Sequence, residues 1–200
     1  MQFKKSEVRE SILKSSEEAF LKHGFEGASL RNIVTNANTS IGNFYNYFNS
    51  KEELFNTLVA HDYEMFMKLL SEHETVERPD HLWDLSNPKI WREVLSEFIV
   101  QFIPEFGNGF VLLIQSSKGT PYENTREVLI KSIEEHFVDH VNRFGENKDL
   151  IGYGSIMASQ FVDGFTKIFL DYDDQKTRNK LLVDHLLFYM IGTMGMIGDF

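Results

Sequence analysis

Apolar residues recur every three or four positions along most of the chain, which is the spacing of amphipathic α-helices. Near the N-terminus this pattern predicts one helix over residues 6–24, a short helix over 29–36, and another that begins at Thr39 or Ser40. Asn38 lies between the two short helices. Asparagine tolerates the left-handed backbone conformation better than most residues, so we expect the chain to reverse direction there.

The second of these short helices has two different faces. Phe44 and Phe48 are four residues apart, which gives the helix one apolar stripe for packing. Two short helices at a sharp angle, the second with an exposed polar and aromatic face, are typical of a DNA-binding helix-turn-helix. The residues of that face can reach phosphates or base edges, and they are Ile41, Asn43, Asn46 and Tyr47.

The rest of the chain is also predicted to be helical. Ser50 followed by Glu53 forms a capping-box pattern, which predicts the start of a long helix that ends near His73. Residues 74–89 contain two prolines and have no sustained period, so they predict a loop. Four further helical patterns follow, over residues 88–104, 120–144, 150–171 and 176–196.

Residues 110–115 form an almost wholly apolar run between glycines. Such a run is compatible with a buried strand or with a buried helix. Because the chain has no second comparable run with which a strand could pair, a short buried helix is favoured.

These patterns predict an all-α fold with an N-terminal three-helix, helix-turn-helix head over residues 1–50 and a helical domain over 51–200. The last two helices are apolar over more than one face, so they need cover that a second subunit can supply.

Composition and charge support this division. A chain of 200 residues with 42% hydrophobic residues can bury a sizeable core, and without cysteine it has no disulfide framework. The net charge of −10 argues against a nucleic-acid partner, but the first 51 residues hold seven basic and five acidic residues and the remainder carries −12. No signal peptide or membrane-spanning run is evident, so we expect a cytoplasmic protein without a membrane partner.

The order Ala-Asn-Thr-Ser-Ile-Gly-Asn-Phe-Tyr-Asn-Tyr-Phe-Asn-Ser-Lys-Glu-Glu-Leu over residues 37–54 resembles the signature of the TetR family of transcriptional regulators. The resemblance covers roughly the first 55 residues. The family usually has glycine where Asn38 stands, an aliphatic residue where Thr39 stands, and often a polar or basic residue where Ile41 stands. Ile41 can offer a base only an apolar contact, such as one with a thymine methyl group.

The resemblance implies a homodimer that binds a palindromic operator in double-stranded DNA and is released by a small apolar or aromatic effector. It also implies a four-helix bundle between protomers, built from the last two helices of each. We expect Ser29 to hold a phosphate, Arg31 and Asn43 to read bases, and Gly42 to allow close approach to DNA or to serve packing. Further phosphate or supporting contacts are expected from Thr39, Ser40, Tyr45, Tyr47 and Lys51.

An effector cavity lined by aromatic side chains of the helical domain is a further implication of the resemblance. Ordinary core packing is the alternative for each of these side chains. The candidates are Trp91, Phe98, Phe102, Phe110, Phe137, Phe161 and Phe165.

Signs of other chemistry are sparse. His136 and His140 are four residues apart on one helix, a spacing that can bind a metal but also fits a solvated polar face. The sequence has no Glu-x-x-His, His-Glu-x-x-His or Gly-x-Ser-x-Gly motif, so we expect no enzyme activity, no cofactor and no metal. The alternatives left open are a metal-responsive regulator and an α-helical enzyme or carrier that kept the head as an appendage.

Overall fold

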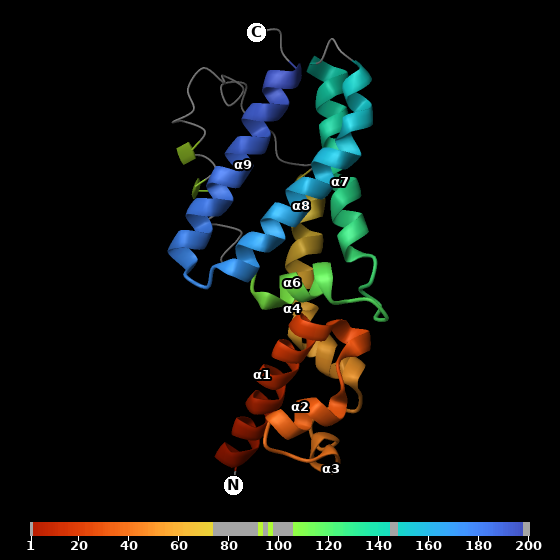
Figure 1. The fold of residues 1–200 in the computed structure, drawn as a ribbon, viewed down its shortest axis with the longest axis vertical. Coiled ribbons are helices and arrows are strands. Elements are labelled where there is room, and N and C mark those ends of the chain that lie inside the picture. The colour runs from red at the N-terminus through yellow and green to blue at the C-terminus, as the bar shows by residue number, and fades with distance from the viewer. Residues whose placement is uncertain (1, 74–91, 94–95, 98–105, 145–147, 198–200) are drawn as a thin grey trace. The chain divides into compact units, whose positions relative to one another are not determined.

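A computed structural model describes residues 2–73, 92–93, 96–97, 106–144 and 148–197, and the secondary structure of these residues is entirely helical (Figure 1). The chain forms two compact units. Unit 1 contains residues 1–67 and 107–126, and unit 2 contains 68–106 and 127–200. The expected domain boundary after residue 50 falls inside unit 1, which also includes a segment from much later in the chain.

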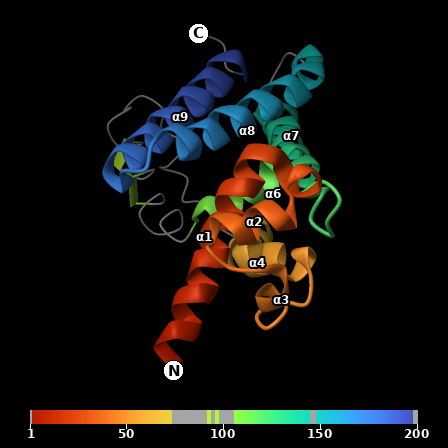
Figure 2. The same ribbon diagram turned by 60° about the horizontal axis from the view of Figure 1, so that its bottom comes forward.

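Unit 1 carries the short helices predicted near the N-terminus (Figure 2). Gly24 interrupts the first helix with φ 70° and ψ 170°, a conformation that glycine adopts without strain, and one further helical turn follows it. The predicted stop at Gly24 is therefore a kink. The helices that belong to this unit are α1 (Gln2–Gly27), α2 (Leu30–Asn36), α3 (Ile41–Phe44), α6 (Asn108–Gln115) and the first part of α4 (Lys51–His73).

The apolar run at 110–115 is a short buried helix, as predicted. It lies in α6, where every residue from Gly109 to Ile114 is buried. Leu112 and Leu113 are fully buried in the same hydrophobic core as Phe20, Phe44 and Phe55 of the N-terminal helices. A helix that is apolar on all sides needs neighbours around most of its circumference, and α6 supplies part of the core of unit 1.

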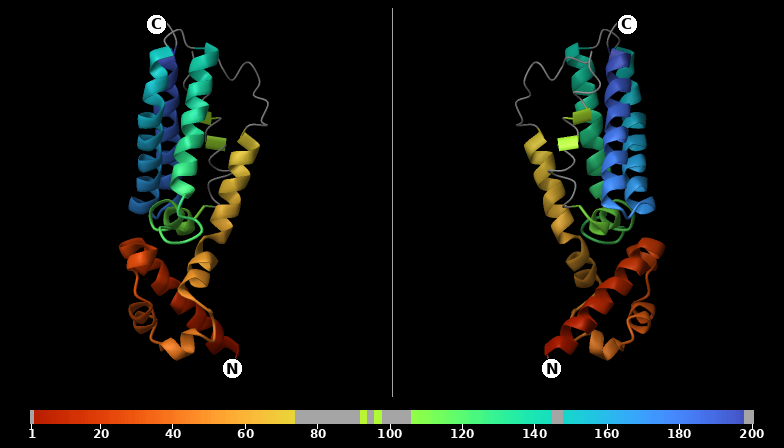
Figure 3. Two further views of the ribbon diagram at one scale, coloured as in Figure 1. Left: turned by 90° about the vertical axis from the view of Figure 1, so that its right-hand side faces the viewer. Right: turned by 90° about the vertical axis from the view of Figure 1, so that its left-hand side faces the viewer.

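In unit 2, three long helices run side by side (Figure 3). The helix predicted over 120–144 begins five residues later, because residues 118–124 form turns. The Thr125 hydroxyl donates a hydrogen bond to the Tyr122 carbonyl oxygen at 2.7 Å. The start of the helix predicted over 150–171 is a 3₁₀ segment, η3 (Lys148–Tyr153). The long helices are α7 (Thr125–Phe144), α8 (Gly154–Asp171) and α9 (Gln175–Ile197).

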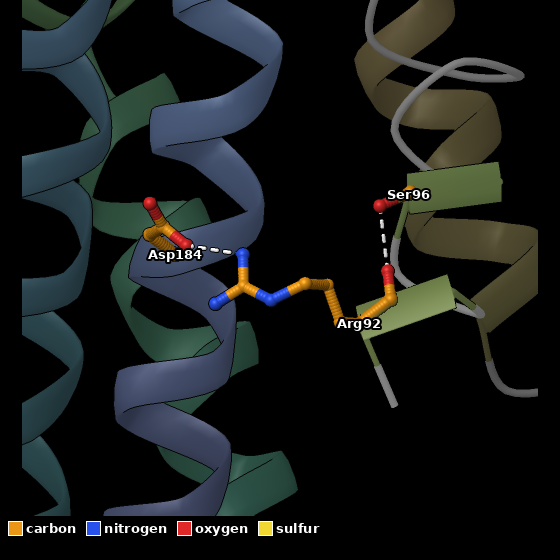
Figure 4. Close-up of polar contacts among 3 residues, drawn as sticks. All are labelled: Arg92, Ser96 and Asp184. Carbon is orange, nitrogen blue, oxygen red and sulfur yellow. Dashed lines mark hydrogen bonds and ion pairs between the residues drawn. The ribbon is translucent and has the colours of Figure 1, made fainter. Parts of the chain in front are cut away.

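Parts of the predicted helix over 88–104 are described and are helical, at residues 92–93 and 96–97. Arg92 Nη1 lies 2.5 Å from Asp184 Oδ1 of α9, and the Ser96 hydroxyl donates to the Arg92 carbonyl oxygen (Figure 4). Both charged side chains are largely exposed, so this ion pair contributes at most about 1 kcal/mol. The predicted loop over 74–89 lies outside the described residues.

Several large apolar side chains of unit 2 are exposed to solvent in the single chain. Phe188 of α9 has an exposed fraction of 73%, and the others on α8 and α9 are Ile156, Leu170, Ile191 and Met196. Within the residues that the structure describes, no helix is both long enough and apolar enough to cross a lipid bilayer.

Candidate nucleic-acid interface

The turn between α2 and α3 is built around Asn38. Its φ is 52°, the only positive value at a non-glycine residue in the described part of the chain. The N–H of Asn38 donates to the carbonyl oxygen of Thr35 at 3.1 Å, and that of Thr39 donates to Val34 at 2.9 Å. These bonds satisfy backbone groups at the end of α2, and they confirm the reversal that the asparagine predicted.

Ser40 begins α3. Its hydroxyl oxygen accepts a hydrogen bond from the Asn43 N–H at 3.1 Å, the expected N-cap contact. Phe44 and Phe48 are both buried, as predicted, and their rings stack with centroids 5.6 Å apart, but α3 ends at Phe44, so Phe48 follows the helix and does not extend a stripe along it. This packing fixes which side of α3 remains in contact with solvent.

Several of the expected DNA contacts are exposed, at the start of α2 and at α3. Ser29 is the N-cap of α2, but its side chain makes no capping hydrogen bond, and Arg31 in the first turn is exposed. Ile41 and Tyr45 have exposed fractions of 42% and 55%. These side chains, which are expected to contact phosphates and bases, are therefore exposed to solvent at the start of α2 and at α3.

Gly42 is also exposed, and its backbone is open. A Cβ at this position would find only the Ser40 hydroxyl, at 4.0 Å. Close packing within the protein therefore does not require glycine here. Close approach of Gly42 to DNA stays a prediction.

Asn43 is half-buried, and its amide is already engaged. Its Nδ2 donates to the Thr39 hydroxyl at 2.8 Å, and its Oδ1 accepts from Asn46 Nδ2 at 3.1 Å. A base could bind Asn43 only by adding to these hydrogen bonds or replacing them. Tyr47 is half-buried as well and packs against the core of unit 1.

Lys51 was expected to contact a phosphate, but its ammonium already makes hydrogen bonds within the protein. Its Nζ donates to the carbonyl oxygens of Phe25 at 2.7 Å and Ala28 at 3.1 Å. Desolvation by burial lowers the pKa of the ammonium, an effect that the nearby charge of Glu26 opposes. A contact between Lys51 and phosphate stays a prediction.

The aromatic residues expected to line an effector cavity do not form one described group. Phe110 lies in unit 1, with its ring centroid 6.3 Å from that of Phe66. In unit 2, Phe137 is buried beside Met157, while Phe161 and Phe165 stack with centroids 6.1 Å apart. Trp91, Phe98 and Phe102 lie outside the described residues.

The two histidines of α7 do lie together. The ring centroids of His136 and His140 are 4.3 Å apart. In the part of the chain that the structure describes, however, no three His, Asp or Glu side chains gather in a way that could hold a metal ion.

One notable polar residue of unit 1 was not among the candidates from the sequence. Asp62 has an exposed fraction of only 6%, and its Oδ1 accepts a hydrogen bond from the Gly107 N–H at 2.7 Å. A signal was present, because Asp62 falls on the same helical stripe as Phe55, Val59 and Phe66. A carboxylate on an apolar stripe predicts a buried hydrogen-bond partner.

Comparison with known proteins places these features in a family context. Residues 12–58 match the family model described as "Bacterial regulatory proteins, tetR family". The chain is 32% identical over 74 residues to the HTH-type transcriptional repressor AcnR of Corynebacterium glutamicum. This match covers 37% of this chain and 39% of that protein. It is 40% identical over 59 residues to the HTH-type transcriptional repressor NicS of Pseudomonas putida, or 30% of this chain and 28% of that protein.

These sequence matches cover well under half of either relative. A solved structure extends the likeness in fold. A TetR family transcriptional regulator from Chloroflexus aurantiacus superposes with a TM-score of 0.52 and 15% sequence identity, over 96% of this chain and 88% of that one. At this identity the likeness concerns the fold alone.

Proposed function

Because residues 12–58 match the family model of the bacterial regulatory proteins of the TetR family, we propose that the chain is a DNA-binding transcriptional regulator of this family, a repressor that an effector releases from its operator. The observation that carries this proposal is the exposed surface formed by the start of α2 and by α3. It presents the hydroxyl of Ser29, the guanidinium of Arg31 and the phenol of Tyr45, and each of these groups can donate to DNA.

Distinct roles follow from the chemistry of these side chains. The Ser29 hydroxyl and the N-terminal N–H groups of α2 are suited to a phosphate. Arg31 is suited to guanine, which accepts two hydrogen bonds in the major groove, and Ile41 to a thymine methyl group. Tyr45 would set the position on the duplex through a second phosphate. Thr39, Ser40, Asn43 and Tyr47 would support these contacts, Asn43 by reading a base if its amide is released.

The proposed assembly is a homodimer through α8 and α9. Its support is the row of exposed apolar side chains on these helices, which a second copy would remove from water. Two copies related by a twofold axis would present two heads to two half-sites, which favours a palindromic operator with half-sites about one helical turn apart.

Regulation would then depend on an effector that prefers one arrangement of the dimer. An effector bound in unit 2 lowers operator affinity only to the extent that it binds the DNA-incompetent state more tightly. The aromatic side chains of this unit, including Phe137, Phe161 and Phe165, favour an apolar or aromatic molecule.

Selection of duplexes from a random-sequence pool tests the proposal. The intact protein, at a stated salt concentration, should enrich a palindromic sequence and bind it at least about a thousandfold more tightly than a scrambled duplex. Equal binding to selected and scrambled duplexes would instead favour an α-helical enzyme or carrier whose head does not read sequence.

A further inference from the structure

Lys51, the first residue of α4, directs its side chain back to the end of α1. Its Nζ donates hydrogen bonds to the backbone carbonyl oxygens of Phe25 and Ala28, at 2.7 and 3.1 Å. The same nitrogen lies 4.4 Å from the centroid of the Phe25 ring. An ammonium has three N–H donors, so two of them are already used within the protein.

The two acceptors are chemically suited to a cation. The Phe25 carbonyl lies in the last turn of α1, where carbonyl oxygens have no partner further along the helix and the helix dipole gives a partial negative charge. Ala28 directly follows this helix. The Phe25 ring adds attraction for a cation over its face. Lys51 therefore provides from α4 a cap for the end of α1 (Gln2–Gly27).

The location of these carbonyls matters for α2. We call residues 24–29 the α1–α2 corner, since they contain the kink at Gly24 and the N-cap Ser29. Ala28 is the residue immediately before Ser29, and its N–H donates to the Gly24 carbonyl oxygen at 3.1 Å. Its own carbonyl is one of the two that Lys51 holds.

Phe25, the other residue that Lys51 holds, is anchored through its backbone and through its ring. The N–H of Phe25 donates to the carbonyl oxygen of Ser116, the C-cap of α6, at 2.8 Å. Its ring packs against Phe20 and Phe55, with centroids 5.8 and 5.4 Å away. Lys51 thus bonds to a backbone that is anchored in the core of unit 1 and continues directly into α2.

We propose that Lys51 is a positioning residue for DNA recognition, which fixes the α1–α2 corner and thereby the direction in which Ser29 and Arg31 leave the head. This role rests on the proposed function, because it concerns how a DNA-reading helix is held. It differs from a phosphate contact, which would use the lysine as a point charge on the surface.

The contact itself is tested without DNA, by amide hydrogen exchange of the full-length chain. Lys51→Met keeps the length of the side chain and removes its donors, and Lys51→Gln is a milder change that keeps one amide group. The control is Lys22→Met, which removes a charge from an exposed lysine of α1. We expect both Lys51 variants to exchange faster by roughly tenfold or more at the hydrogen-bonded amides of Phe25 and Ala28, and to match the control elsewhere. Unchanged exchange at these residues refutes the contact.

The role in recognition is tested with the selected duplex and its scrambled form over a range of salt concentrations. A positioning role predicts that Lys51→Met loses more affinity for the selected duplex than for the scrambled one, with the salt dependence of the wild-type protein. A phosphate contact predicts equal losses on both duplexes and a salt slope smaller by about 0.9, and that result overturns the proposal. If the wild-type protein prefers neither duplex, the proposed function fails and this role fails with it, whereas the exchange data still decide whether the contact exists.

Discussion

The carboxylate of Asp62 on α4 accepts a hydrogen bond from the backbone N–H of Gly107, the N-cap of α6, at 2.7 Å. A negative charge is favourable at the N-terminal end of a helix, where N–H groups lack partners. This contact joins residues 45 positions apart within unit 1. The hydrogen bond between Asp62 and Gly107 therefore attaches α6 to α4.

Folding stability should depend on the protonation of Asp62. Burial raises the pKa of this carboxyl above its ordinary 3.8, and the N–H groups of Gly107 and Phe110 oppose the rise. Because the folded protein holds this proton to higher pH than the unfolded chain does, the stability contributed by proton binding is complete below 3.8 and is lost as pH rises through the folded pKa. We therefore expect the free energy of unfolding of the wild-type protein, minus that of Asp62→Asn, to decrease across this window.

Denaturant unfolding at a series of pH values measures this difference. Glu52→Gln serves as the control, because Glu52 is an exposed carboxylate on the same helix. A difference between wild type and Asp62→Asn that stays constant with pH would contradict the prediction.

Gly109 allows α6 to approach α4 closely. A Cβ at this position would overlap the Asp62 carboxylate and lie 2.6 Å from the Leu58 carbonyl oxygen. Gly109→Ala should therefore lower the free energy of unfolding by about 1–3 kcal/mol. Gly107→Ala is the matched control, since a Cβ there meets nothing within 4 Å and the N–H that Asp62 binds is kept. Equal unfolding midpoints for the two variants would show that the close approach at Gly109 does not matter.

Gly42 separates folding from DNA binding. Since a Cβ would meet only the Ser40 hydroxyl at 4.0 Å, and alanine favours helix over glycine by about 1 kcal/mol, Gly42→Ala should leave the thermal midpoint unchanged or raise it. Affinity for the selected duplex should nevertheless fall by roughly tenfold, or 1.4 kcal/mol, if α3 approaches DNA at this residue. Unaltered affinity in a titration of this variant would remove Gly42 from the interface.

Arg31→Ala should change which sequences are bound. If Arg31 reads one base pair of each half-site, the variant loses about 1–3 kcal/mol on the selected duplex and tolerates substitutions at that position. Binding to the selected duplex and to single-base variants of it measures both effects, with the exposed Lys22→Ala as the control for lost charge. A loss that is the same on every duplex would assign Arg31 to the backbone of DNA.

Among the large apolar side chains that the structure describes, Phe188 is the most exposed, at 73%, and it tests the proposed dimer surface. A carboxylate there would have to be buried without a partner when two copies associate, so Phe188→Glu should weaken the dimer by about 2 kcal/mol or more. Analytical ultracentrifugation over a concentration series gives the dissociation constant. Gln175→Glu adds the same charge at an exposed position of α9 and should not alter it, whereas an equal effect of both variants would indicate only charge repulsion.

The local features of unit 1 could be predicted from the sequence because each depends on residues within a few positions. Asn38 has the positive φ that its turn required. The Ser50 hydroxyl caps α4 by accepting from the Glu53 N–H at 3.0 Å, as the capping-box pattern indicated. The Glu53 carboxylate, however, accepts from the N–H of Asn49 where the pattern predicts that of Ser50.

The contacts of Lys51 and Asp62 could not be predicted in the same way. Lys51 binds carbonyl oxygens 23 and 26 positions earlier, and Asp62 binds an N–H 45 positions later. Periodicity reports which face of a helix is apolar, but it does not report which distant backbone group meets that face. Periodicity placed Ile41 and Asn46 on an exposed face, and both are exposed, but it placed Asn43 and Tyr47 there as well, and these are half-buried. It gave no sign that the Lys51 ammonium is used within the protein.

Unit 1 includes residues 107–126 from far along the chain, and this matters for any chimera built from this protein. A chimera that joins residues 1–50 to a foreign body would lack Leu112 and Leu113 of the shared core, as well as the Ser116 carbonyl that holds Phe25. A domain exchange that keeps unit 1 intact must therefore carry both stretches of sequence, residues 1–67 and 107–126. Because the two stretches of unit 1 share one core, substitutions in residues 107–126 are expected to coevolve with those in residues 1–67.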